Sequence, residues 1–315
     1  MSRNVFLLKS WWLNAGDGFV KRGCHLLLRE ILPPEYNLVS VSMLGANKYS
    51  INKSFSEKGD FPSVLDLLLD DNDILILAGC ILDSKIGRLT KKLKAIGKRP
   101  NIVLLGAGAR SFEPNDVTAT RNALKELAPD IIVSRDRKSH DHFGDLAKKS
   151  ALGIDCAYFN ILDNLPIDSK RDLTIRTFNR MKDPFPDPEA IYPLHSPFSL
   201  SVESSIRGLL RNARTTISRP ILDKSIEYFI SDDVEEYIAL YRLASLVHTD
   251  MVHATVASIC YGTMVQMHHK NPRVGVITEV VGDEVLQRPT VIDTSYLRHI
   301  VEDNIRVVES LLHDL

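Results

Sequence analysis

The sequence predicts an α/β protein with two doubly wound parallel sheets facing a cleft. Short apolar runs alternate with amphipathic helical stretches, as in sheets whose parallel strands are connected by helices. The runs at 74–77 and 102–105 are apolar at every position, as expected when helices cover both faces of a strand. A proline-rich stretch at 160–197 separates two sets of these units. We therefore expect an N-terminal domain over residues 1–159 and a C-terminal domain over 160–315.

The first domain repeats a strand, a turn and a helix. The expected strands occupy residues 4–8, 38–43, 73–77, 101–105 and 131–134. Amphipathic helices are expected at 18–30, 62–69, 86–96, 116–127 and 139–149, the last with Ser139 as its cap.

The second domain follows the proline-rich stretch and repeats the pattern. Strands are expected at 173–178, 226–230, 246–248 and 264–267, and helices at 202–211, 234–242, 252–261 and 294–313. Gly262 closes the third of these helices, and the last helix carries apolar residues at helical spacing.

The composition of the chain argues against several classes of protein. The 315 residues include 39 Lys and Arg against 40 Asp and Glu, so no cationic surplus predicts nucleic-acid binding. The four cysteines lie far apart, which indicates buried thiols in a reducing compartment rather than a disulfide framework. No apolar run is long enough for a signal peptide or a membrane span, so we expect a cytoplasmic protein. No cofactor or metal is expected, because His248, His268 and His269 lack a third ligand at a suitable spacing.

Ligands of open parallel sheets bind beyond the carboxyl ends of the strands, where two loops are rich in glycine. The loop after the first strand contains Asn14, Gly16 and Asp17, and a helix starting there would direct free N–H groups at an anion. The alternative, which the sequence supports equally, is that Asp17 only caps that helix. Gly106 and Gly108 form a turn bordering the cleft; a nicotinamide site is less favoured, because the third glycine is missing and Pro114 delays the helix.

Two charged or titratable residues complete the candidate site. Arg135 follows the strand at 131–134, and its planar guanidinium suits a carboxylate or phosphate. The alternative is a surface ion pair of Arg135 with Asp136, or of Arg137 with Asp141. His253 lies in the first turn of an apolar helix, where the dipole disfavours a protonated ring and favours proton exchange. The alternative is a buried structural histidine.

The order and spacing of several motifs resemble the polysaccharide pyruvyl transferase family. The matching residues are Asn14, Gly16 and Asp17; Val133-Ser134-Arg135-Asp136 with Ser139; Asp155; Met251-Val252-His253-Ala254; Gly262-Thr263-Met264; and Asn271-Pro272-Arg273-Val274. The resemblance implies two Rossmann-like domains, as in glycosyltransferases of the B fold.

The resemblance also implies a reaction. Such enzymes transfer a pyruvyl group from phosphoenolpyruvate to a sugar hydroxyl, forming a ketal in surface polysaccharide biosynthesis. Arg135 would hold the donor anion, His253 would transfer a proton and Arg273, in place of the family's Lys, would add a second cation. The glycine-rich loops would line the substrate site, and the acceptor sugar would be nucleotide-linked or lipid-linked.

One departure keeps alternatives open. Met251 replaces the family's Arg in the motif that contains His253. If the loss of this guanidinium prevents phosphoenolpyruvate binding, the chain would be a glycosyltransferase with a nucleotide-sugar donor, or a non-catalytic relative that binds glycans or nucleotides. Homo-oligomerisation is also left open by the sequence.

Overall fold

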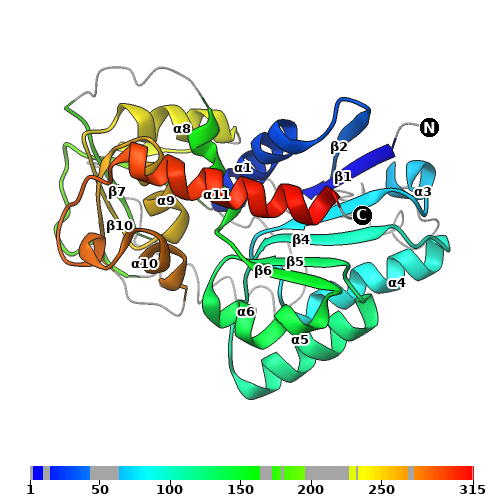
Figure 1. Ribbon diagram of the computed structural model, residues 1–315. Coiled ribbons are helices and arrows are strands. Elements are labelled where there is room, and N and C mark those ends of the chain that lie inside the picture. The colour runs from blue at the N-terminus through cyan, green and yellow to red at the C-terminus, as the bar shows by residue number, and fades with distance from the viewer. Residues whose placement is uncertain are drawn as a thin grey trace, which may run out of the picture.

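The computed structural model contains two parallel sheets flanked by helices (Figure 1). It describes residues 3–9, 15–42, 64–163, 172–178, 181–195, 227–231, 233–268, 273–313 and 315. The strand order is β2-β1-β3-β4-β5-β6 in the first sheet and β11-β10-β7-β8-β9 in the second. All pairs of neighbouring strands within the sheets are parallel. The predicted α/β fold with parallel, doubly wound sheets is confirmed.

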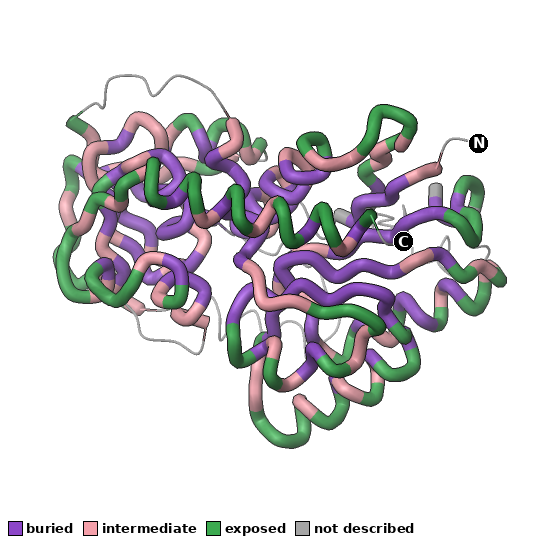
Figure 2. The backbone as a smooth tube through the Cα atoms, in the orientation of Figure 1, coloured by how far each residue is buried: buried purple, intermediate pink, exposed green. Residues whose placement is uncertain are grey.

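The first sheet is built as the apolar runs predict. Its strands are β1 (Arg3–Lys9), β2 (Tyr36–Ser42), β3 (Ile74–Ala78), β4 (Asn101–Ala107), β5 (Ile131–Ser134) and β6 (Lys149–Leu152). Its helices are α1 (Ala15–Ile31), α3 (Val64–Leu68), α4 (Gly87–Ile96), α5 (Pro114–Leu127) and α6 (Arg137–Phe143), with a 3₁₀ turn η2 at Ser84–Ile86. Strands β3, β4 and β5 are buried along nearly their whole length (Figure 2).

Three local predictions in this domain are wrong. The helix expected at 139–149 ends at Phe143, and a 3₁₀ turn η3 (Gly144–Leu146) leads into the missed strand β6. Its cap is Asp136 rather than Ser139, since the Asp136 carboxylate accepts a hydrogen bond from the Ser139 N–H at 2.7 Å. Helix α5 starts at Pro114 rather than at residue 116, because the first turn of a helix does not need the missing N–H.

The second sheet gathers short strands from distant parts of the chain. Its strands are β7 (Thr174–Thr177), β8 (Ile191–Pro193), β9 (Glu227–Phe229), β10 (Leu246–Thr249) and β11 (Met264–Met267). Its helices are α8 (Val234–Leu243), α9 (Val252–Cys260), α10 (Gly275–Val281) and α11 (Thr294–His313), with a 3₁₀ turn η5 at Glu284–Leu286. The helix expected at 202–211 lies outside the described residues. Strand β8 and helix α10 were not predicted from the sequence.

The two sheets share a continuous apolar core. One cluster of buried side chains includes Val103 of the first sheet and Val247 of the second. Between them lies the 3₁₀ segment η4 (Cys156–Leu162), which packs against α1, α9 and α11. Helix α11 runs back from the second sheet toward the first (Figure 1). The first residues of η4 therefore lie where elements of both domains meet.

None of the helices in the described ranges is long and apolar enough to cross a membrane.

Candidate functional site

Arg135 is buried at the carboxyl end of β5. Its side chain is 1% exposed, and its backbone N–H donates to the Ala107 carbonyl at 3.1 Å. The Nη1 atom donates to Asp155 Oδ2 at 2.7 Å, and the Nε atom lies 3.7 Å from Asp136 Oδ2. The Arg135–Asp136 ion pair weighed as an alternative exists, but it is buried rather than on the surface.

The turn after β4 packs directly on this guanidinium. A Cβ atom placed on Gly108 would lie 2.0 Å from Arg135 Nε, so only glycine leaves room for the buried side chain. Gly106 has φ of +54°, and a Cβ there would lie 2.8 Å from the Cys156 nitrogen. Packing of the protein itself thus accounts for both glycines; their proposed contact with substrate stays a prediction.

Asp155 connects this arginine to the second domain. The carboxylate is fully buried and caps η4, because Oδ1 accepts the Ala157 N–H at 2.9 Å. Burial alone would raise the pKa of Asp155, but His253, Arg135 and the Ala157 N–H together hold that pKa well below its usual range. Asp155 therefore stays ionised at neutral pH.

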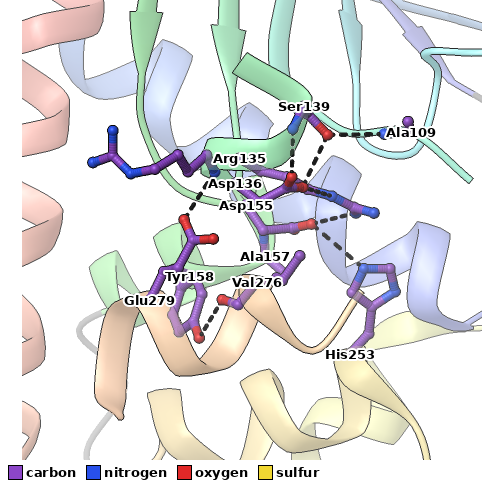
Figure 3. A network of polar contacts seen from close by, with 11 residues as sticks. Ala109, Arg135, Asp136, Ser139, Asp155, Ala157, Tyr158, His253, Val276 and Glu279 are labelled. Atoms are coloured by element: carbon purple, nitrogen blue, oxygen red, sulfur yellow. Dashed lines mark hydrogen bonds and ion pairs between the residues drawn. The ribbon is translucent and has the colours of Figure 1, made fainter. Parts of the chain in front are cut away.

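His253 reaches the same carboxylate from the other side. It lies in the first turn of α9, and its Nε2 atom is 3.6 Å from Asp155 Oδ2. This nitrogen is buried and has no hydrogen-bond partner. Figure 3 shows the Arg135 guanidinium and the His253 imidazole converging on the Asp155 carboxylate. Residues from the ends of strands in both sheets thus meet at one buried anion.

A second contact joins the domains beside this group. Glu279 of α10 accepts a hydrogen bond from the Arg137 N–H at 2.8 Å. The Tyr158 hydroxyl of η4 donates to the Val276 carbonyl, also in α10, at 3.1 Å. Both bonds place the start of α6 and the start of η4 against the same helix of the second domain.

The structure describes three of the four remaining predicted site residues. Gly16 and Asp17 lie in the first turn of α1, and Arg273 is half-buried just before α10. Asn14 lies outside the described residues. At the start of α1, the Ala15 N–H donates to the His195 carbonyl at 2.9 Å, so this loop contacts the second domain.

His195 is a residue of this region that sequence reasoning missed. Its ring is buried, with Nε2 2.6 Å from the Tyr241 hydroxyl and Nδ1 without a hydrogen-bond partner. Phe19 of α1 packs against the ring edge-to-face, with centroids 5.7 Å apart. Burial lowers the pKa of His195 to about 3, with a smaller contribution from the neighbouring His253, so the His195 ring is neutral at pH 7. The proline-rich stretch carries no periodic pattern that would have placed this residue at a strand end.

Met251 occupies the position of the family's Arg. It caps the start of α9 without a side-chain hydrogen bond to the helix, and its sulfur accepts a bond from the Thr177 hydroxyl at 3.5 Å. The thioether therefore packs against the end of β7, in place of a cation.

The histidines weighed as metal ligands form a separate pair. His248 Nδ1 lies 3.0 Å from His268 Nε2, on the second sheet, and burial lowers the pKa of His248 to about 4. Within the described residues, no group of three potential ligands gathers around a metal position. His269 lies outside them.

Comparisons with known proteins agree with the fold. Among solved structures, the chain is similar to a functionally uncharacterised protein from Klebsiella pneumoniae, with 14% identity, 93% and 94% of the two chains covered and a TM-score of 0.51. It is also similar to S. aureus MnaA in a structure with UDP (12% identity, 96% and 88% covered, TM-score 0.51). A third is UDP-GlcNAc 2-epimerase from Neisseria meningitidis bound to UDP-GlcNAc (9% identity, 98% and 93% covered, TM-score 0.50). These likenesses concern the fold and confirm the predicted similarity to the glycosyltransferase B fold.

The comparison of sequences is more specific. No curated protein matches the chain. The family model described as "Polysaccharide pyruvyl transferase" matches residues 14–265, a range that contains Arg135, Asp155 and His253. This match points to a transferase that modifies polysaccharides. Because it spans well over half of the sequence, the chain belongs to the polysaccharide pyruvyl transferase family.

Proposed function

We propose that the protein transfers the pyruvyl group of phosphoenolpyruvate to a sugar as a ketal. The observation that carries this proposal is the convergence of Arg135, Asp155 and His253 between the two sheets. A cation and a proton-transferring group side by side suit a donor that is an anion and must gain a proton. We also infer a cytoplasmic location, which the four free thiols support.

The reaction has a simple balance. The methylene carbon of the donor takes a proton and becomes a methyl group, two sugar oxygens bond to the neighbouring carbon, and the bond from that carbon to the phosphate oxygen breaks. The two sugar hydroxyls release two protons, of which one replaces the proton given to carbon and the other leaves with phosphate. A positioned histidine can move these protons, which contributes about 10²–10⁴ in rate.

Each predicted residue has a role in this proposal. His253 transfers the proton, and Arg135 supplies positive charge for the donor anion while it holds Asp155 in place. Arg273 is the second cation, since Met251 offers none. The loops with Asn14, Gly16 and Asp17, and with Gly106 and Gly108, line the substrate site.

A second donor is kept as a candidate. Two of the similar structures were solved with UDP or a UDP-sugar, and Met251 stands where the family's donor-binding Arg would be. A nucleotide-sugar donor would make the protein a glycosyltransferase. If neither donor reacts, the remaining hypothesis is a non-catalytic protein that binds glycans or nucleotides.

Thermal unfolding and phosphate release separate these functions. Phosphoenolpyruvate should raise the melting temperature, because a ligand that binds only the native state stabilises it. With sugar acceptors, it should also release inorganic phosphate. Stabilisation by UDP-sugars alone would favour the glycosyltransferase. Binding of a glycan without turnover of either donor would favour the non-catalytic role.

A further inference from the structure

The two ring nitrogens of His253 have different surroundings. Nε2 is buried, lacks a hydrogen bond and faces Asp155 Oδ2 at 3.6 Å. Nδ1 is not among the buried side-chain atoms of the described residues that lack a partner. The side chain as a whole is 14% exposed, so part of the ring is accessible from outside while Nε2 is buried against the carboxylate.

The Asp155 carboxylate can act only as a hydrogen-bond acceptor toward His253. Arg135 Nη1 donates to Oδ2 at 2.7 Å and the Ala157 N–H donates to Oδ1 at 2.9 Å, and both donors favour the ionised carboxylate. An ionised carboxylate has no proton to donate. A neutral imidazole beside it is therefore stabilised when the nitrogen that faces the carboxylate carries the hydrogen.

We propose that Asp155 is a positioning residue that holds neutral His253 as the Nε2–H tautomer, so that Nδ1 is the nitrogen that exchanges a proton with substrate. This inference rests on the proton-transfer role given to His253 in the proposed function. Nδ1 takes the proton of a sugar hydroxyl, and the imidazolium formed is stabilised by the Asp155 charge at Nε2. The same Nδ1 then returns the proton to the methylene carbon of the donor.

The distance is consistent with a bond that forms in the substrate complex. At 3.6 Å the contact exceeds hydrogen-bond length by about 0.6 Å. Catalytic hydrogen bonds are commonly long before substrate binds and tighten in the complex. Asp155 belongs to the segment after β6 and His253 to α9, so a small displacement of one element relative to the other would bring the two atoms within hydrogen-bond distance.

Nitrogen NMR of the protein labelled with ¹⁵N-histidine tests the proposal directly. The sequence has ten histidines, so the His253 signals are assigned by their loss in His253→Gln. At a pH where the ring is neutral, we expect the wild-type His253 ring to be in the Nε2–H form. A ring that carries its hydrogen on Nδ1, or an even mixture of tautomers in the wild type, overturns the proposal.

Asp155→Asn supplies the comparison. Asn keeps an oxygen for the Ala157 N–H but removes the charge, and we expect mixed tautomers and at least a tenfold loss of kcat with a smaller change in KM for phosphoenolpyruvate. Asp136→Asn is the matched control: it also removes a carboxylate charge near Arg135, Asn caps α6 equally well, and Asp136 is not paired with His253. It should leave the tautomer unchanged, and an equal effect of both variants on the tautomer contradicts the proposal.

Different results would contradict the proposed pyruvyl transfer and the positioning role of Asp155. If the wild type shows the Nε2–H tautomer but no phosphate is released from phosphoenolpyruvate, the proposed function is wrong and the positioning role of Asp155 stands. If phosphate is released but the tautomer is Nδ1–H, only the positioning role fails. The NMR result on the wild type requires only that His253→Gln, which serves for the assignment, folds; it does not require Asp155→Asn to fold.

Discussion

The two sheets contribute to the site in different ways. At the end of the first sheet, Arg135 is held between Asp155 and Asp136 and covered by Gly108, so its position is determined from several sides. At the ends of strands in the second sheet, His195 and His253 each keep a buried ring nitrogen without a hydrogen bond. Arg135 Nε is likewise buried without a hydrogen bond, so the two sheets differ in charge: the first supplies a guanidinium paired with carboxylates, and the second supplies imidazole rings.

This difference has an energetic basis. A buried ion pair repays its desolvation only when both partners are present and well placed. A neutral imidazole tolerates burial better than a charged group, and its free nitrogen remains available to a ligand. The free energy of unfolding should therefore depend mainly on the buried ion pair of Arg135, and turnover on the imidazole rings.

The largest expected effect on stability comes from breaking the buried pair. Arg135→Ala leaves the Asp155 carboxylate buried without its cation, which should lower the free energy of unfolding by about 3–5 kcal/mol. Urea unfolding at pH 7 measures this loss. As a control, Glu235→Gln removes a half-exposed partner of Arg22, which keeps Asp163, and should cost less than about 1 kcal/mol. Equal losses in the two variants would contradict the contrast between the sheets.

His253→Gln should act on turnover instead. Gln cannot transfer a proton in the same way, so kcat for phosphate release should fall at least about a hundredfold, while phosphoenolpyruvate still raises the melting temperature. The unfolding free energy should change little compared with Arg135→Ala. Unchanged turnover would remove His253 from the mechanism.

The smallest expected effect is a pH dependence from His195. Burial lowers its folded-state pKa to about 3, below the ordinary value of 6.5, so its contribution to stability is present above pH 6.5 and is lost as pH falls toward 3. Between pH 7 and pH 5 the loss from this group should be about 2 kcal/mol.

The matched variant for this pH dependence is His195→Gln. Gln retains a partner for the Tyr241 hydroxyl but does not titrate. Urea unfolding of both proteins at pH 7 and pH 5 gives the difference. If both lose the same free energy over this interval, His195 is not the titrating group.

Much of the site was predictable because its residues follow recognisable strands. The apolar run at 131–134 placed Arg135 at a carboxyl end, and the helix after 252 placed His253 in a first turn. His195 was missed because β8 is only three residues long and lies among prolines, where neither helical nor strand periodicity develops. The role of Asp155 was also missed, although the residue was matched to a family motif.

Residue patterns along the chain were sufficient to predict the parallel sheets and the positions of Arg135 and His253 at the ends of their strands, because local periodicity reports which faces of a strand or helix are buried. The folded chain was needed to show that Asp155 lies between Arg135 and His253, that Gly108 packs on the guanidinium and that His195 belongs to the same region. These contacts join residues far apart in the chain, and no local pattern encodes the distance between such residues. They arise from the packing of two domains around η4.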